Sequence, residues 1–317
     1  MTDDERASGR RTSGLEADSP GDARILDGRR LAEQIYAETA SDLSEFGTAS
    51  GELPGVAIVM VGDDRASAVY ARQIMRAAER IGTSGRLVEL AGDASLEQVR
   101  AVVEQLNRDS SVAGVIFQLP LPRHLAIRTV ASDLDPLKDI DGVSSLSAGL
   151  VSQGEAGFAP SCAEAAVLIL KRYGIPIAGR PAVVVGRSNV VGRPAQLLLI
   201  REHATVTVCH RQTRDLGDEL RRAEIVIVAA GSPGLVKGDA IRPGAVVIDC
   251  GINVLEDGSL AGDVEMASVS RVASALTAVP GGVGPVTNAV LMRHLGRAIR
   301  AQRSRTGVGG LIARPAS

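Results

Sequence analysis

The chain has 317 residues, of which 45% are hydrophobic and 23% are charged, and its formal net charge is −2. This length predicts about two domains. The balanced charge and the scarcity of aromatic residues (three Tyr, three Phe and no Trp) disfavour a nucleic-acid binder. No apolar run reaches the ~18–20 residues that span a bilayer. The three separated cysteines, Cys162, Cys209 and Cys250, are typical of neither a disulfide framework nor a metal cluster. We therefore expect a soluble cytoplasmic enzyme without a metal, contacting neither membrane nor nucleic acid.

The first half of the chain alternates strands with helices. Residues 1–23 are polar and are expected to form a disordered tail. Leu31, Ile35 and Leu43 then follow a helical period. The apolar patterns predict strands at Gly55–Gly62, Arg86–Leu90 and Gly114–Gln118, and helices at Ala66–Ile81 and Leu96–Asn107. This alternation is typical of βαβ units and a mostly parallel sheet.

A second series of strands follows a looser stretch at Asp135–Gly149 and a helix at Cys162–Tyr173. The strands are expected at Ala182–Gly186, Ala204–Cys209, Glu224–Ala230, Ala245–Asp249 and Leu276–Val279, with helices between the first four. The last helix, Val286–Gln302, has no strand after it and is expected to return to the first domain. Residues 303–317 read as a second disordered tail. The predicted domains are 24–160 plus 286–302, and 161–285.

A glycine-containing turn, GRSNVVGRP at residues 186–194, lies between a predicted strand and a predicted helix. Glycines allow a sharp turn, and a helix N-terminus favours phosphate. The spacing between Gly186 and Gly192 differs from G-x-G-x-x-G. A phosphate-binding turn and a plain strand–helix turn are both consistent with this sequence alone.

The end of the next strand bears on the choice of dinucleotide. NAD-selective sites usually place a carboxylate there, about 20 residues after the turn, for the ribose 2′-hydroxyl. Residues 209–213 contain no carboxylate, but they contain Arg211. Arg211, together with Arg187 in the turn, suits a 2′-phosphate. The chemistry favours NADP, and the alternative is that both arginines are solvated loop residues.

Six segments together resemble one family. They are VGDDRASAVY, GVIFQLPLP, DPLKDIDG, GIPIAGRPAVVVGRSNVVGRP, GAVVIDCGIN and PGGVGPVT. From about Ala23 to Ala301, in order and spacing, the chain resembles the methylenetetrahydrofolate dehydrogenase/methenyltetrahydrofolate cyclohydrolase family. The resemblance implies an N-terminal parallel-sheet α/β domain and a C-terminal Rossmann-like NADP-binding domain, with a cleft between them. It also implies a tetrahydrofolate one-carbon substrate and a homodimer.

The resemblance carries functional roles onto matching residues. It places Tyr70, Gln118 and Asp141 at the catalytic centre: an aromatic face for the pterin, an amide near the reacting carbon, and a carboxylate for the aminopyrimidinone edge. Folate would also meet Ser67, Pro280, Gly281 and Gly282. The implied NADP contacts are Gly186, Arg187, Ser188, Val191, Gly192, Arg211, Ile252 and Thr287.

One departure from the family pattern affects the chemistry. The family's cyclohydrolase motif is Tyr-x-x-x-Lys, which puts the lysine one helical turn after the tyrosine, but here Ile74 follows Tyr70 at that spacing. Arg72 and Arg76 are predicted to lie off this face, and arginine does not readily give up a proton. Gln73 lies on roughly the right face, but an amide is no acid–base catalyst. Ile74 instead extends an apolar stripe along the helix.

Two further departures concern the shape of the folate pocket. Pro160–Ala165 replaces the family's Pro-x-Thr-Pro-x-Gly helix start, and Val143-Ser144 replaces a common Phe-His. We therefore expect an NADP-dependent methylenetetrahydrofolate dehydrogenase with weak or absent cyclohydrolase activity. Two alternatives remain open: a non-catalytic folate- and NADP-binding paralogue, and an enzyme that acts on a different one-carbon or imine substrate.

Overall fold

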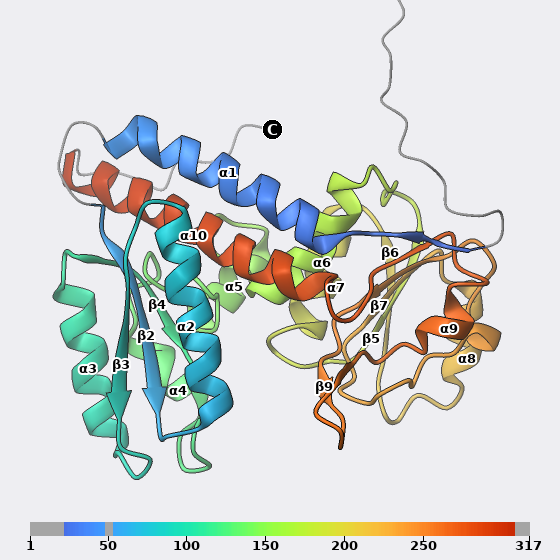
Figure 1. Ribbon diagram of the computed structural model, residues 1–317, viewed down its shortest axis with the longest axis horizontal. Coiled ribbons are helices and arrows are strands. Elements are labelled where there is room, and N and C mark those ends of the chain that lie inside the picture. Colours follow the sequence, from blue (N-terminus) through green and yellow to red (C-terminus); the bar gives the residue numbers. More distant parts are fainter. Residues whose placement is uncertain (1–21, 48–52, 308–317) are drawn as a thin grey trace, which may run out of the picture.

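The computed structural model describes residues 22–47 and 53–307 (Figure 1). Its first sheet has three parallel strands in the order β3-β2-β4: β3 (Gly85–Leu90), β2 (Gly55–Val61) and β4 (Val112–Phe117). Every residue of β2 and β4 is buried, as expected for strands covered on both faces. The helices α2 (Arg65–Arg80) and α3 (Leu96–Arg108) follow the first two strands. The predicted elements are confirmed to within two residues at each end.

The second sheet has six strands, all parallel, in the order β1-β11-β8-β7-β5-β6. Their bounds are β1 Arg24–Ile25, β11 Ala275–Leu276, β8 Val246–Asp249, β7 Ile225–Val228, β5 Pro181–Val185 and β6 Thr205–Cys209. The helices α7 (Gly192–Arg201) and α8 (Leu216–Arg222) connect β5 to β6 and β6 to β7. This arrangement confirms the predicted Rossmann-like second sheet.

The helix expected between β7 and β8 is absent from this part of the structure. Only a short 3₁₀ turn, η2 (Gly238–Ala240), lies there. The connection carries four glycines and two prolines between Gly231 and Gly244, and this density opposes a longer helix. An antiparallel hairpin of β9 (Asn253–Val254) and β10 (Leu260–Ala261), and a short helix α9 (Met266–Val269), complete this half.

Two long helices join the halves. The helices α1 (Gly28–Gly47) and α10 (Val283–Gly307) lie side by side (Figure 1). A Cβ atom on Gly296 of α10 would lie 3.2 Å from the Thr39 methyl group of α1, so glycine suits this close approach. Because α10 also packs against α2, β4 and α6 (Ser161–Arg172), the last helix returns to the first sheet as predicted.

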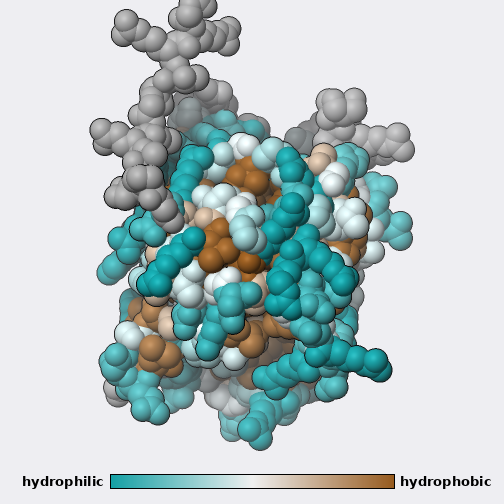
Figure 2. All heavy atoms as spheres, turned by 90° about the vertical axis from the view of Figure 1, so that its right-hand side faces the viewer, coloured by the Kyte–Doolittle hydropathy of each residue, from teal (hydrophilic) through white to brown (hydrophobic). Residues whose placement is uncertain are grey.

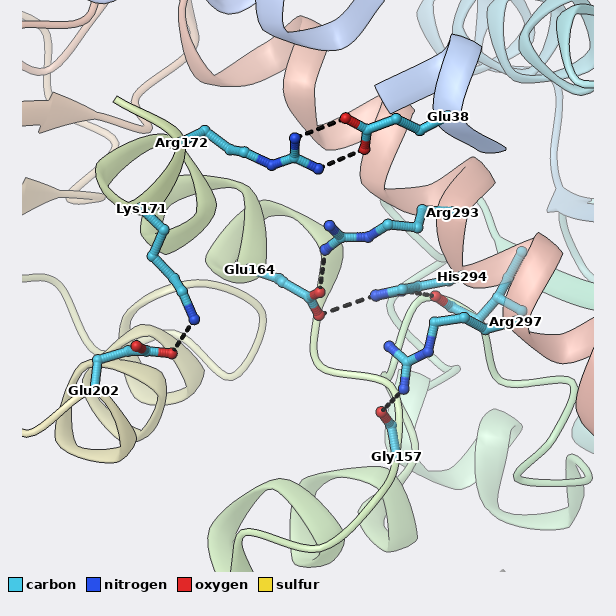
Figure 3. A network of polar contacts seen from close by, with 10 residues as sticks. Glu38, Gly157, Glu164, Lys171, Arg172, Glu202, Arg293, His294 and Arg297 are labelled. Carbon is cyan, nitrogen blue, oxygen red and sulfur yellow. Dashed lines mark hydrogen bonds and ion pairs between the residues drawn. The ribbon is translucent and has the colours of Figure 1, made fainter. Parts of the chain in front are cut away.

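A polar network fixes α6 between α10 and α1 (Figure 3). Glu164 of α6 accepts from Arg293 (2.6 Å) and pairs with His294 Nε2 (2.9 Å), both on α10. The other ring nitrogen of His294 lies 2.8 Å from the Ile140 carbonyl oxygen. Burial raises the pKa of Glu164, but attraction to His294 and Arg293 outweighs it and brings that pKa to about 2. The carboxylate is therefore held ionised.

Several predicted boundaries need correction. Strand β1 pairs with β11, so Arg24 and Ile25 belong to the second sheet rather than to the first domain. Ala23 is buried and its amide bonds the Ser270 carbonyl at 2.7 Å, so it is no part of a disordered tail. Residues 303–307 belong to α10, which extends to Gly307, and not to the predicted disordered tail. The rest of both predicted tails, residues 1–21 and 308–317, lies outside the described residues.

The loose stretch before α6 also contains helices that the pattern missed. Helix α5 (Ser145–Gln153) begins at Ser144, whose side chain accepts from the Ser147 amide, and ends at Gly154 in the left-handed region. Short helical turns at α4 (Ile127–Val130) and η1 (Ala131–Asp133) precede it. Local capping and packing against α7, rather than apolar periodicity, account for α5.

The surface at the second-sheet end carries apolar side chains between hydrophilic ones (Figure 2). In the chain as a whole, Ile200, Leu235, Leu255 and Met266 are among the exposed apolar residues. No helix within the described ranges has the length and apolar character needed to cross a membrane.

Candidate active site

A cavity of about 800 Å³ lies between the two halves of the molecule. Helices α1 and α2 form one wall, and the segments after β8 and β11 form the other. Of the residues predicted from sequence, the cavity brings together Tyr70, Ile252, Pro280, Gly281, Gly282 and Thr287. Ser67, Gln118 and Asp141 do not line it, and neither do Gly186, Arg187, Ser188, Val191, Gly192 or Arg211.

Tyr70 is presented by the second turn of α2. The helix begins at Asp64, whose carboxylate accepts from the Ser67 amide at 2.7 Å. The Tyr70 hydroxyl donates to Asn288 Oδ1 of α10 at 2.8 Å. Burial, together with the nearby Asp141 carboxylate, raises the pKa of Tyr70 far above its usual value. The phenol therefore stays protonated and serves as a donor and an aromatic surface, not as a base.

The position at which the resemblance places the family's lysine, Ile74, is closed to the cavity. Ile74 is fully buried in the core, and with Ala77, Ala78 and Ile81 it forms the predicted apolar stripe. Gln73 lines the cavity instead. Arg76 also lines the cavity, so the expectation that it points away from the site was wrong. The cavity wall on α2 is wider than the helix face that carries Tyr70. Among the described lining residues there is neither lysine nor histidine.

Asp141 is held by the KDIDG loop beside the cavity. Lys138 anchors the loop by donating to the Leu106 and Asp109 carbonyl oxygens at 2.7 and 2.8 Å. Asp141 Oδ1 accepts from the Ser161 hydroxyl at 2.6 Å, which leaves Oδ2 without a hydrogen bond to the described residues. Burial raises the pKa of Asp141, and the Ser161 hydroxyl partly offsets this.

Gln118 stands at the end of β4 with an unsatisfied amide. Its Nε2 donates to the Leu119 carbonyl oxygen at 3.0 Å, while its buried Oε1 has no partner within the described residues. A buried acceptor without a partner carries a desolvation penalty, and a donor on a ligand would remove it. Ser67 reaches the same carbonyl at 3.5 Å, a weak contact from α2.

The glycines after β11 serve packing as well as access to the cavity. Gly281 has a φ of 109°, a conformation that other residues rarely adopt. A Cβ atom on Gly28, at the start of α1, would lie 1.7 Å from the Gly282 carbonyl oxygen. The backbone at the start of α1 therefore packs directly on the backbone at Gly282. From the sequence, these glycines were expected only to let a ligand approach the backbone.

The predicted phosphate turn lies at the carboxyl end of the second sheet, outside the cavity. Gly186 has a φ of 122°, and a Cβ atom on Gly192 would lie 2.2 Å from the Gly186 carbonyl oxygen. Both positions therefore require glycine for the turn itself. Helix α7 starts at Gly192, and the Ser188 hydroxyl accepts from the Val191 amide at 3.1 Å.

Two cations stand near this turn. Arg187 is part of it, and Arg211 follows β6, the strand adjacent to β5, so both lie at the same end of the sheet. Both side chains are exposed, and neither forms an ion pair with a described residue. A helix start with two unpaired guanidinium groups fits the chemistry of a phosphorylated dinucleotide.

Sequence reasoning missed polar residues that the fold brings to the cavity. Asn288 binds Tyr70, and Asp249 lines the cavity beside Cys250. Burial raises the pKa of Asp249 to about 6. Its oxygens accept from the amides of Gly251, Asp263 and Val264, so this carboxylate closes a turn and is not free for catalysis. Tyr70 and Asn288 lie 218 residues apart, so no local sequence pattern indicates their contact.

The fold and the cavity define a two-domain α/β protein with a Rossmann-like sheet and an interdomain cleft. Residues 26–141 match the catalytic domain of tetrahydrofolate dehydrogenase/cyclohydrolase, and residues 160–303 match the NAD(P)-binding domain of the same family. The chain belongs to this family.

Relatives and solved structures agree with that assignment. The chain is 46% identical to "Bifunctional protein FolD" of Chloroflexus aurantiacus, over 90% of this chain and 99% of that protein. The bifunctional FolD enzyme of Campylobacter jejuni superposes with a TM-score of 0.86 at 36% identity, covering 88% of this chain and 99% of that one. The Trypanosoma brucei enzyme, solved with NADP and an inhibitor, has a TM-score of 0.84 at 33% identity, covering 89% and 99%.

Proposed function

We propose that the protein oxidises 5,10-methylenetetrahydrofolate to 5,10-methenyltetrahydrofolate with NADP, and that it hydrolyses the product weakly or not at all. Family membership supports the dehydrogenase step. The observation that carries the second part is the burial of Ile74 at the lysine position, beside a cavity whose described lining has no lysine.

The residues around the cavity would orient the folate. Asp141 has one carboxylate oxygen available to accept N–H groups from the pterin edge. The unpartnered Gln118 Oε1 would accept a donor near the reacting carbon. Tyr70, fixed through its hydroxyl to Asn288, offers an aromatic face. NADP, when bound, supplies the hydride acceptor. The protein then contributes mainly orientation, since the substrate's own nitrogen assists loss of the hydride.

Hydrolysis of the methenyl product makes different demands. Water must be activated and protons must move between two nitrogens, and a positioned acid–base group contributes ~10²–10⁴-fold to such steps. Tyr70 stays protonated because burial raises its pKa, and Asp249 is occupied by three backbone amides. We therefore infer that the rate of methenyltetrahydrofolate hydrolysis is lower by the same ~10²–10⁴-fold.

Arg187 and Arg211 support NADP over NAD as the cofactor. Both guanidinium groups are exposed at the end of the sheet that carries the phosphate turn, and no carboxylate occupies residues 209–213 to hold a ribose 2′-hydroxyl. Gly186, Ser188, Val191, Gly192, Ile252 and Thr287 would complete the cofactor contacts.

We also propose a cytoplasmic homodimer. Strand β6 is the last strand of the second sheet, and no described strand pairs with its outer edge. Open edges of this kind are available for pairing with another chain. Ile200 on the adjacent α7 is 54% exposed, which supplies apolar area beside that edge. Light scattering after size-exclusion chromatography tests this: a dimer mass supports it, and a monomer mass refutes it.

A paired assay tests the proposed activity. NADPH formation from methylenetetrahydrofolate and decay of methenyltetrahydrofolate are followed separately on the same purified protein. The expected result is clear dehydrogenase turnover with hydrolysis at least ~10²-fold below that of a lysine-bearing relative measured in parallel.

The alternatives predict other outcomes of the same experiment. Saturable binding of NADP and folate without hydride transfer would indicate a non-catalytic paralogue. Binding of NADP without methylenetetrahydrofolate would indicate a different one-carbon or imine substrate. Hydrolysis at the relative's rate would refute the argument from Ile74.

A further inference from the structure

Two of the three cysteines meet in the cleft. Cys162 is the second residue of α6, and Cys250 directly follows β8, so they come from segments far apart in the chain. Both side chains are half-buried and line the same 800 Å³ cavity, and their thiols lie close enough to shift each other's pKa. Cys209 is buried in β6 among a separate set of core residues. The chain therefore has one dithiol open to the cleft and one isolated thiol.

The two thiols have unequal surroundings. The hydrogen bond from Cys250, with a further one from Thr287, lowers the pKa of Cys162. The position of Cys162 in the first turn of a twelve-residue helix acts in the same direction. The same hydrogen bond, together with burial, raises the pKa of Cys250.

The acidic groups facing this pair are Asp141 on the side of Cys162, and Asp249 and Asp263 on the side of Cys250. Their negative charge opposes ionisation of both thiols. The hydrogen bond from Cys250 outweighs this effect at Cys162, whereas at Cys250 the same hydrogen bond acts in the same direction as the acidic groups. Cys162 is therefore the nucleophile of the pair, and Cys250 is the thiol that retains its proton.

We propose that Cys162 and Cys250 form a redox-active pair that a peroxide oxidises to a disulfide across the cleft. The Cys162 thiolate attacks one peroxide oxygen, the O–O bond breaks, and hydroxide leaves as a sulfenic acid forms. The Cys250 sulfur then attacks the sulfenic sulfur, forming the S–S bond, and the departing oxygen leaves as water. In total the two thiols lose two protons and two electrons, and these reduce hydrogen peroxide to two molecules of water.

The disulfide would tie the start of α6 to the turn after β8. Ser161, next to Cys162, holds Asp141 in place, and Ile252, two residues after Cys250, lines the cavity. The two sulfurs must move closer together to form a covalent bond, so Asp141 and Ile252 would shift with them. Small displacements in a catalytic cleft have large effects on rate, and we expect dehydrogenase activity to fall roughly tenfold or more. This consequence rests on the proposed dehydrogenase function.

Mass spectrometry of the full-length protein treated with hydrogen peroxide tests the chemistry. The expected result is an intact mass lower by two hydrogens and a cross-linked peptide pair containing Cys162 and Cys250, both reversed by dithiothreitol. The Cys209→Ser variant should behave like the wild type, whereas Cys162→Ser and Cys250→Ser should form no intramolecular disulfide. Oxidation of Cys162 to the sulfinic acid without cross-linking, or two unmodified thiols, would overturn the proposal.

Activity is measured on the same samples, each normalised to its own untreated rate. Wild type and Cys209→Ser should lose activity reversibly, and the two cleft variants should not. If the untreated protein has no dehydrogenase activity, the proposed function fails, but the mass measurement still decides whether the dithiol forms a disulfide. If the disulfide forms and the rate is unchanged, the inferred inhibition is wrong.

Discussion

Replacing Glu164 by Gln should destabilise the protein in a pH-dependent manner. The carboxylate lies between Arg293 and His294, with 20% of its side chain exposed. Its pKa falls from the usual 4.5 to about 2 because the interactions with His294 and Arg293 outweigh the opposing effect of burial. At roughly 1.36 kcal/mol per pKa unit, the ionised pair contributes about 3 kcal/mol at neutral pH. Glu164→Gln should lose about that amount.

The sign of the pH dependence follows from linkage. Between pH 4.5 and pH 2, Glu164 is protonated in the unfolded chain but ionised in the folded one, so the unfolded state binds more protons. The stabilisation is fully present above the unfolded-state pKa and is lost as the pH falls through the folded pKa. The difference in unfolding free energy between wild type and variant should therefore narrow by roughly 1.4 kcal/mol for each pH unit between pH 4.5 and pH 2.

Urea denaturation of both proteins, at neutral pH and in steps down to acid, measures this difference. Glu202→Gln is the matched control, because Glu202 pairs with Lys171 at 2.6 Å on the surface, where such a pair is worth about 0–1 kcal/mol. A Glu164→Gln loss no larger than the control's, or one that stays constant with pH, would refute the reasoning.

Three further predictions concern the cleft and the cofactor turn. Gln73→Lys places a lysine on the cavity wall and should raise the rate of methenyltetrahydrofolate hydrolysis without unfolding the protein. Ile74→Lys buries a charge and should mainly lower the thermal unfolding temperature. Equal changes in hydrolysis rate and unfolding temperature for the two variants would contradict the placement of these side chains. Arg211→Gln should raise KM for NADP by roughly ten- to a hundredfold and leave KM for NAD unchanged; parallel changes would show that Arg211 meets no 2′-phosphate. Gly192→Ala brings a Cβ atom to 2.2 Å from the Gly186 carbonyl oxygen and should destabilise by about 1–3 kcal/mol, measured by urea denaturation, and weaken NADP binding; a fully stable variant would rule out the tight turn.

Regular elements of this fold follow from local pattern, and its exceptions follow from long-range contacts. The strand Gly55–Val61 and the helix Arg65–Arg80 carry enough periodicity or apolar content to be predicted closely. Helix α5 does not, because its nine residues are rich in serine and have no apolar face, so capping and packing determine it. The two-residue strand β1 forms only because β11 is there to pair with it.

The same division holds for the site. Tyr70 and the glycines at 281 and 282 stand in recognisable motifs, and the structure brings them to one cavity. The partner of Tyr70, Asn288, lies 218 residues away and belongs to no motif. The proximity of Cys162 and Cys250 likewise arises only in the fold, which brings the start of α6 and the residue after β8 to the same cavity.

The most direct test of a dehydrogenase without an effective cyclohydrolase is a single reaction in which NADPH and methenyltetrahydrofolate are quantified together. The reaction starts from methylenetetrahydrofolate and NADP. Because Ile74 is buried, we expect methenyltetrahydrofolate to accumulate in step with NADPH and to be removed only by its slow uncatalysed hydrolysis. Formation of 10-formyltetrahydrofolate in step with NADPH, at a rate that depends on enzyme concentration, would contradict it.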